Sequence, residues 1–234
     1  MNVIKRIKLF GDSLFLGIQA NPENMRYRVD NHLGIEEISQ KYSLQVENCS
    51  RMGSTIMKGN VLLEKRMEGG LACDVVIMDY GGNDCDFNWK AISDAPDAEH
   101  HPNTPLDVFV DTYHKMIDAL TERGILPVLT TLPPLDPQRF FDWFMRGLDK
   151  ESVLRWLGGV NTIYRYQENY SRVIERIARN RGIPLVDVRG EFLSRRRIDD
   201  LLSQDGIHPS SAGQAVISKA FAEFAHSRVS VAAT

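Results

Sequence analysis

Five short apolar stretches alternate with longer stretches of helical periodicity along this chain, and this alternation constrains the fold more than any other feature. Residues Val75 to Met78 are consecutively apolar, as in a strand that is buried on both faces. In residues 160–181 the apolar side chains instead recur every three or four positions, which is typical of a helix with one buried face. Strands that alternate with helices in this way form a parallel sheet covered by helices on both sides.

The pattern also predicts where the main elements lie. Strands are expected at residues 3–10, 44–48, 74–79, 125–131 and 184–188, and helices at residues 30–42, 55–68, 106–123, 160–181 and 211–228. We therefore expect an α/β fold, with a five-stranded parallel sheet as the middle layer of a three-layer α/β/α sandwich.

Length and composition predict one globular domain that binds no nucleic acid. A chain of 234 residues can form a single α/β domain, here residues 1–234 with insertions near 85–105 and 133–159. The net charge of -3 offers no excess of positive charge for a nucleic-acid surface. The basic run Arg195 to Arg197 is followed by two aspartates and is expected to be a solvated face.

The first residues and the cysteines indicate a cytoplasmic protein without a cofactor. Residues 1–10 carry three cations among apolar residues and read as a core strand, so we expect no signal peptide and no stable membrane insertion. The three cysteines lack the spacing of a zinc site or a disulfide framework. His100 and His101 lie in a proline-rich acidic loop, where a metal site is not expected.

Ser13 occupies a position suited to a nucleophile. It lies in the run Phe10-Gly11-Asp12-Ser13-Leu14, directly after the first expected strand. Ligands of open α/β sheets bind at the carboxyl ends of the strands, so this hydroxyl is expected at the edge where a site forms.

His208 and Asp205 supply the partners that a serine nucleophile needs. A serine hydroxyl requires an imidazole to accept its proton, and the imidazole requires an acceptor to fix its tautomer. Asp205 and His208 are three residues apart, and Gly206 between them allows a tight bend. The candidate catalytic residues are therefore Ser13, Asp205 and His208.

At these positions the sequence resembles the GDSL or SGNH hydrolases, whose motif blocks are matched in order. The blocks are Gly11-Asp12-Ser13-Leu14, a second block with Gly53, Gly81-Gly82-Asn83-Asp84, and Asp205 with His208. In the second block Ser50 stands where the family often has a further glycine. The resemblance implies a flavodoxin-like fold of the SGNH hydrolase type, with Ser13 as the nucleophile.

Acyl transfer also needs donors for the negative charge that develops on the carbonyl oxygen. Glycine lets a backbone N–H approach closely, and an asparagine side chain is a neutral donor. The expected oxyanion hole therefore consists of the Ser13 N–H, the Gly53 N–H and the Asn83 side chain. Taken singly, each of these residues is also an ordinary turn former, and Asp12 and Asp84 are interpreted as structural.

The second insertion is rich in aromatic residues and is expected to influence substrate preference. Phe140, Phe141 and Phe144 are candidate substrate-binding residues in a lid or wall for an apolar group. An equally weighted alternative is that these side chains cover the core or form a contact in a homo-oligomer.

The function predicted from these observations is a serine esterase that acts on a small soluble ester through an acyl-enzyme. A short acyl group, such as an acetyl group on a carbohydrate, is the suggested substrate. An acyltransferase, a thioesterase or a lysophospholipase would use the same residues, so these alternatives stay open. A binding protein without catalytic activity is a remote alternative, because no member of the triad is missing.

Overall fold

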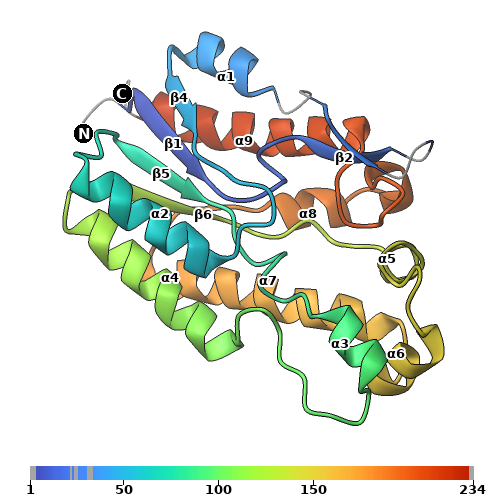
Figure 1. The fold of residues 1–234 in the computed structure, drawn as a ribbon. Coiled ribbons are helices and arrows are strands. Elements are labelled where there is room, and N and C mark those ends of the chain that lie inside the picture. The colour runs from blue at the N-terminus through green and yellow to red at the C-terminus, as the bar shows by residue number, and fades with distance from the viewer. Residues whose placement is uncertain (1–3, 22, 24–25, 31–33, 232–234) are drawn as a thin grey trace.

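A five-stranded parallel sheet forms the centre of the molecule (Figure 1). Its strand order is β4-β1-β5-β6-β7. The computed structural model describes residues 4–21, 23, 26–30 and 34–231. The strands are β1 (Arg6–Phe10), β4 (Gln45–Asn48), β5 (Val75–Met78), β6 (Leu126–Thr130) and β7 (Leu185–Val186). All neighbouring pairs in this sheet are parallel, so the carboxyl ends of the strands share one edge.

Helices cover both faces of the sheet, which confirms the predicted three-layer sandwich. Each face of the sheet packs against its own hydrophobic core. Along β5, Val75 and Ile77 belong to the core on one face, whereas Val76 and Met78 belong to the core on the other face. The first face is covered by α1 (Ile35–Tyr42), α8 (Val188–Leu193) and α9 (Ser211–Val231), and the second by α2 (Ile56–Glu68), α4 (Leu106–Thr121) and α7 (Asn161–Arg181).

Most of the predicted elements are somewhat shorter in the structure, and two of the shortened ends have a clear local cause. The strand predicted at 184–188 ends at Val186, because the carboxylate of Asp187 accepts a hydrogen bond from Gly190 N–H at 2.9 Å and caps α8. The helix predicted at 30–42 begins only at Ile35, and Asp30 instead donates its N–H to the Gly17 carbonyl. Residues 31–33, like residue 3 of the first predicted strand, lie outside the described residues.

The sequence did not reveal a short antiparallel hairpin that follows the Ser13 turn. Its strands are β2 (Ile18–Asn21) and β3 (Arg26–Val29), and they form a separate two-stranded sheet. The base of the hairpin is anchored at the Gly17 carbonyl, which accepts hydrogen bonds from Asp30 N–H and from the Gln214 side chain. Each of these strands has only four residues, and β3 is largely exposed. Such short strands show little hydrophobic periodicity, so the sequence does not predict them.

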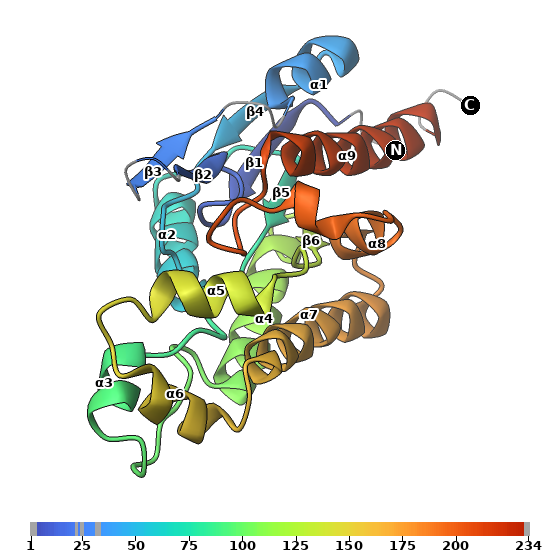
Figure 2. The same ribbon diagram turned by 90° about the vertical axis from the view of Figure 1, so that its right-hand side faces the viewer.

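The two insertions pack on one another and form a cover with its own apolar core. Helix α3 (Trp89–Asp94) comes from the first insertion, and α5 (Pro137–Phe144) and α6 (Lys150–Leu157) come from the second. Asp136 caps α5 and Asp149 caps α6 by accepting backbone hydrogen bonds. Figure 2 shows α3 and α6 side by side beyond α5, and the backbone of Asp149 donates to Ser93 Oγ at 2.9 Å.

Within the described ranges, no helix combines the length and the apolar character needed to cross a membrane.

Candidate active site

Three segments of the chain that follow neighbouring strands meet at the carboxyl edge of the sheet. Ser13 follows β1, Gly53 follows β4 and Asn83 follows β5, and all three line one cavity of about 270 Å³. His208 reaches the same cavity from the loop that precedes α9. The structure therefore brings together residues that are up to 195 positions apart in the sequence.

Ser13, His208 and Asp205 form a continuous chain of hydrogen bonds. Ser13 Oγ lies 2.9 Å from His208 Nε2, and His208 Nδ1 lies 2.5 Å from Asp205 Oδ2. Because a carboxylate can only accept, Nδ1 carries the proton and Nε2 presents a lone pair to the serine hydroxyl. This is the tautomer that can remove the serine proton.

The loop that carries Asp205 and His208 is held by backbone hydrogen bonds. Ser203 donates its N–H to the His208 carbonyl at 2.7 Å, and Gly206 donates its N–H to the Ser203 carbonyl at 3.0 Å. Gly206 has φ +76°, and a Cβ there would lie 2.6 Å from the carbonyl oxygen of Asp136 at the start of α5. Only glycine fits both the bend and this close approach.

The carboxylate of Asp205 is fully buried yet remains the charged member of the site. Burial alone would raise its pKa, but the hydrogen bonds from His208, the charge of that imidazole and the hydroxyl of Ser203 together hold the pKa of Asp205 below its ordinary value. The second oxygen, Oδ1, accepts from Ser203 Oγ and from the N–H groups of Ile207 and His208. Asp205 therefore both orients the imidazole and shapes the loop.

The predicted oxyanion donors surround the same space, and one of them is already bonded. The N–H groups of Ser13 and Gly53 have no protein acceptor among the described residues, which leaves them available to a ligand. Asn83 Nδ2 lies 2.6 Å from Asp12 Oδ2 and 3.3 Å from the Ser54 carbonyl, so its amide is oriented by these acceptors. Asp12, interpreted as structural from the sequence, thus also positions Asn83.

A model of the GDSL-like lipase/acylhydrolase family matches residues 9–216, which is most of the 234-residue chain. The chain belongs to this family. It is accordingly an ester-hydrolysing enzyme, as the motif blocks predicted. No functionally curated protein matches it as a relative.

Solved structures similar to this GDSL-family hydrolase share its fold over nearly the whole chain. A lipase/acylhydrolase from Enterococcus faecalis has 18% identity and a TM-score of 0.64, covering 96% of this chain and 97% of that chain. An α/β hydrolase from the metagenome of Lake Arreo has 20% identity and a TM-score of 0.64, covering 96% of both chains. A catalytic mutant of an acetylxylan esterase from Geobacillus stearothermophilus has 18% identity and a TM-score of 0.63, covering 96% and 95%. At such identities the likeness establishes the fold.

The hairpin of this hydrolase contributes a residue that sequence reasoning missed. Tyr27 of β3 packs edge-on against the His208 ring at 5.0 Å between centroids and approaches the Trp143 ring at 6.4 Å. Burial, followed by the nearby charge of Asp205, raises the pKa of Tyr27 to about 12, so the phenol stays protonated at neutral pH. The ring contact places Tyr27 over one side of the His208 imidazole.

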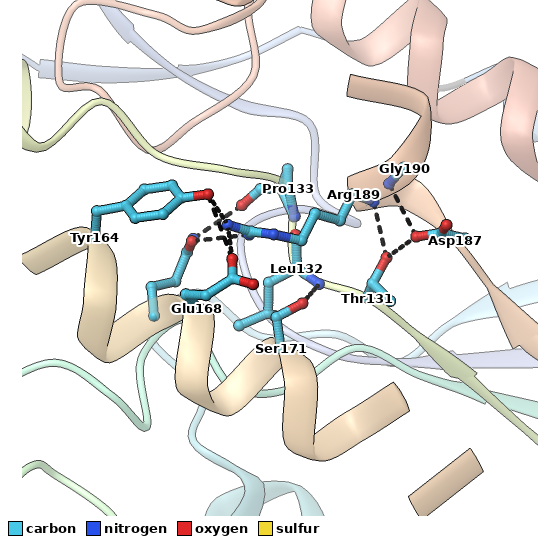
Figure 3. A network of polar contacts seen from close by, with 10 residues as sticks. Thr131, Leu132, Pro133, Tyr164, Glu168, Ser171, Asp187, Arg189 and Gly190 are labelled. Carbon is cyan, nitrogen blue, oxygen red and sulfur yellow. Dashed lines mark hydrogen bonds and ion pairs between the residues drawn. The ribbon is translucent and has the colours of Figure 1, made fainter. Parts of the chain in front are cut away.

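A buried arginine, Arg189, is bonded to the segment that follows β6, and Figure 3 shows its network of polar contacts. Arg189 is only 3% exposed, and its guanidinium donates to the Leu132 carbonyl, to Gln167 Oε1 and to the Tyr164 hydroxyl. It also forms an ion pair with Glu168. Gln167 in turn donates to the Pro133 carbonyl at 2.9 Å. Leu132 and Pro133, which line the cavity, are therefore held by a hydrogen-bond network that no sequence motif predicts.

Two of the three candidate substrate-binding phenylalanines line the cavity, and one does not. Phe140 and Phe144 are four residues apart on α5, share one face of the helix and both line the cavity. Phe141 points elsewhere: it is buried in the core of the cover, with the Lys150 ammonium 5.6 Å from its ring centroid. Phe141 does not line this cavity because adjacent helix positions face different directions, and a role for it in substrate binding stays a prediction.

Gly53→Ala is expected to lower kcat by about tenfold to a hundredfold, with a smaller effect on KM. Gly53 has φ +68°, and a Cβ added there would meet no atom within 4 Å, so the cost of the substitution comes from the backbone conformation. Relaxing that conformation would move the N–H away from the position expected for the oxyanion. Gly124→Ala is the matched control, because Gly124 has φ +70° and equally open surroundings but does not line the cavity. Both variants should lose similar stability in thermal unfolding. Equal activities in the two variants would contradict a role for the Gly53 N–H.

Proposed function

We propose that this hydrolase is a serine esterase that works through an acyl-enzyme on Ser13. The observation that carries the proposal is the pair of contacts that connects the three residues, 2.9 Å from Ser13 Oγ to His208 Nε2 and 2.5 Å from His208 Nδ1 to Asp205 Oδ2. These are the distances over which a proton can pass from the hydroxyl to an imidazole held in the correct tautomer.

The reaction follows from these contacts. Ser13 Oγ attacks the ester carbonyl while His208 Nε2 takes its proton, and the N–H groups of Ser13 and Gly53 stabilise the oxyanion. The amide of Asn83 joins them when it releases one of its present acceptors, Asp12 or Ser54. Collapse of the tetrahedral intermediate breaks the ester bond, and His208 returns the proton to the departing alcohol. Water then attacks the acyl-enzyme with His208 again as the base, which releases the acid and restores Ser13.

The walls of the cavity favour an ester with a compact apolar or aromatic part. Most of its lining is hydrophobic, and aromatic side chains contribute a large share: Tyr27, Phe87, Trp89, Phe140, Phe144 and Tyr166. Such walls bind substrate mainly by burial of apolar surface. The acetyl ester of a carbohydrate, suggested from the sequence, is one substrate to compare with simple esters.

Covalent labelling tests the proposed mechanism. A fluorophosphonate probe should modify wild-type enzyme at Ser13, as peptide mapping would show, and hydrolysis of p-nitrophenyl esters should be lost in parallel. His208→Ala should not label at a comparable rate, because the hydroxyl then lacks its base. Labelling of another residue, with Ser13 unmodified in an enzyme that hydrolyses esters, would overturn the assignment.

Phe144→Ala is expected to change the preference for acyl chain length. Removal of this ring enlarges the cavity, so kcat/KM for p-nitrophenyl octanoate should rise relative to the acetate by about fivefold or more, corresponding to roughly 1 kcal/mol of altered burial. Phe141→Ala is the control from the same helix, since this ring is buried in the cover but does not line the cavity. It should lower stability and leave the length profile unchanged. A profile that shifts equally in both variants would argue against a direct contact between Phe144 and substrate.

A further inference from the structure

Carboxyl groups outnumber basic groups among the side chains that line the active-site cavity. The acids Asp12, Asp79 and Asp86 line it, and no lysine or arginine does so among the described residues. Burial and the neighbouring Asp12 raise the pKa of Asp79 well above its ordinary range, which disfavours the charged form of this carboxyl group. A cleft with anionic groups and low-dielectric walls attracts cations and repels anions.

Asp86 carries this negative charge into the aromatic part of the cavity. It follows Asn83 by three residues and is half-buried. Its Oδ1 accepts from Trp89 Nε1 at 2.7 Å, and no arginine or lysine forms an ion pair with it in the part of the chain that the structure describes. Burial raises the pKa of Asp86 to about 6, so the carboxylate is mostly ionised at neutral pH and is compensated only by neutral donors.

Aromatic rings from both insertions and from α7 line the same cavity as this carboxylate. Phe87 lies 5.0 Å from Tyr166, Trp89 lies 5.8 Å from Phe140, and Phe140 lies 4.5 Å from Phe144, measured between ring centroids. The faces of such rings are electronegative and attract ammonium groups, while the methyl groups of a substituted ammonium bury apolar surface against them. Rings and one carboxylate are the groups that a bulky organic cation would need as an enclosure and a counter-charge.

We propose that the cavity binds an ester that carries a substituted ammonium group, with Asp86 as the counter-charge and the surrounding rings as the apolar enclosure. The inference rests on the proposed esterase function and specifies its substrate class. It also predicts discrimination against esters with a carboxylate or phosphate near the reacting carbonyl, because those groups would be desolvated beside Asp86 without a cationic partner.

Pairs of isosteric substrates test the charge preference directly. Butyrylcholine and 3,3-dimethylbutyl butyrate have the same shape on the alcohol side and differ only in the quaternary nitrogen. The p-nitrophenyl esters of 4-(trimethylammonio)butanoate and 5,5-dimethylhexanoate form the matched pair on the acyl side. We expect kcat/KM for the cationic ester to exceed that for its neutral partner by about tenfold or more in one of the two pairs. The pair that shows the preference identifies the side of the carbonyl on which the ammonium binds.

Two carboxamide variants separate a local contact from general electrostatics. Asp86→Asn preserves the shape of the side chain and removes its charge, so the ratio of cationic to neutral kcat/KM should fall by about tenfold towards unity. Asp94→Asn removes the same charge from the same insertion, but the Asp94 side chain is 60% exposed and pairs with Lys90, so its ratio should match that of wild type. Equal reductions in the two variants would overturn the role of Asp86.

The pH dependence of the wild-type ratio provides a test that needs no variant. The other titratable groups that line the cavity are Asp12, Asp79, Cys85, Tyr27, Tyr166 and His208. Protonation of the triad affects both substrates of a pair and cancels in the ratio. Because an acid with a pKa of about 6 loses its charge below that pH, the preference for the cation should decline as pH falls through about 6.

The outcomes distinguish the two proposals. If neither member of either pair is hydrolysed and Ser13 does not label, the proposed esterase function fails. If the neutral esters are hydrolysed as well as or better than the cationic ones in both pairs, the esterase function stands and the ammonium site is wrong. Inhibition of wild-type enzyme by choline should likewise be stronger than inhibition by its neutral isostere 3,3-dimethylbutan-1-ol, and equal inhibition would contradict the site.

Discussion

Ser13→Ala is expected to lower kcat by about 10⁵-fold or more, because the variant retains the cavity but lacks the proposed nucleophile. Folding should be almost unaffected, since Ser13 is partly exposed and its hydroxyl bonds to His208 at the cavity and not within the core. The measurement is kcat on p-nitrophenyl butyrate together with thermal unfolding of both proteins.

Combining Ser13→Ala with His208→Ala should cost no more activity than the larger of the two single losses. The hydroxyl and the imidazole act as one unit across 2.9 Å, so removing either disables the other. Losses that multiply in the double variant would show that the two residues act independently and would contradict the proposed proton transfer.

Asp205→Asn is expected to have the second largest effect, a decrease in kcat of about 10³- to 10⁴-fold. An asparagine can still accept the hydrogen bonds from Ser203, Ile207 and His208 through its carbonyl oxygen, so the loop is preserved. Its amide N–H would face Nδ1 and favour the tautomer with the proton on Nε2, which cannot accept from Ser13. Steady-state kinetics should show the loss mainly in kcat.

The control for this prediction is Ser203→Ala, which removes one neutral donor to Asp205 and leaves the tautomer unchanged. Ser203→Ala should lower kcat only a few-fold, because a single hydrogen bond between neutral and charged groups usually contributes modestly. A loss as large as that of Asp205→Asn would mean that loop geometry, and not the tautomer, limits the reaction.

Asp205→Asn should also alter the pH dependence of stability. The folded pKa of Asp205 lies below its ordinary value, so the ionised carboxylate stabilises the fold at pH values above the unfolded pKa of about 4. That contribution disappears as pH falls through the folded pKa. The stability difference between wild type and the variant should therefore shrink as pH falls below about 4, which denaturant titrations at several pH values would measure.

Much of the fold was predictable because it depends on local periodicity. The consecutive apolar residues of β5 and the three-to-four spacing in α7 report burial that any parallel sheet with covering helices would produce. The β2–β3 hairpin was missed because its strands are short and β3 is exposed, so burial leaves no pattern there. Strand β7 ends earlier than predicted because Asp187 caps α8, and this cap outweighs the strand propensity of the neighbouring β-branched residues.

Some residues of the candidate site could be identified from the sequence, and others only from the structure. Ser13, Gly53 and Asn83 were identifiable because each follows a strand and belongs to a motif, and the sheet then brings the strand ends together. Tyr27 and Arg189 belong to no motif, and their positions depend on contacts with α5, α7 and the histidine loop. Sequence spacing placed Phe140, Phe141 and Phe144 together, but only the orientation of α5 separates the two lining rings from the third.

The sequence by itself determined the alternation of strands and helices and the residues that could perform acyl transfer, because hydrophobic periodicity and motif chemistry act over a few neighbouring positions. Tertiary structure alone decided that Asp12 orients Asn83, that Tyr27 covers His208 and that Asp86 lies in a cavity among aromatic rings. Those surroundings arise when segments far apart in the chain pack together. The charge and shape of the cavity, and with them the proposed substrate class, are therefore properties of the packed molecule.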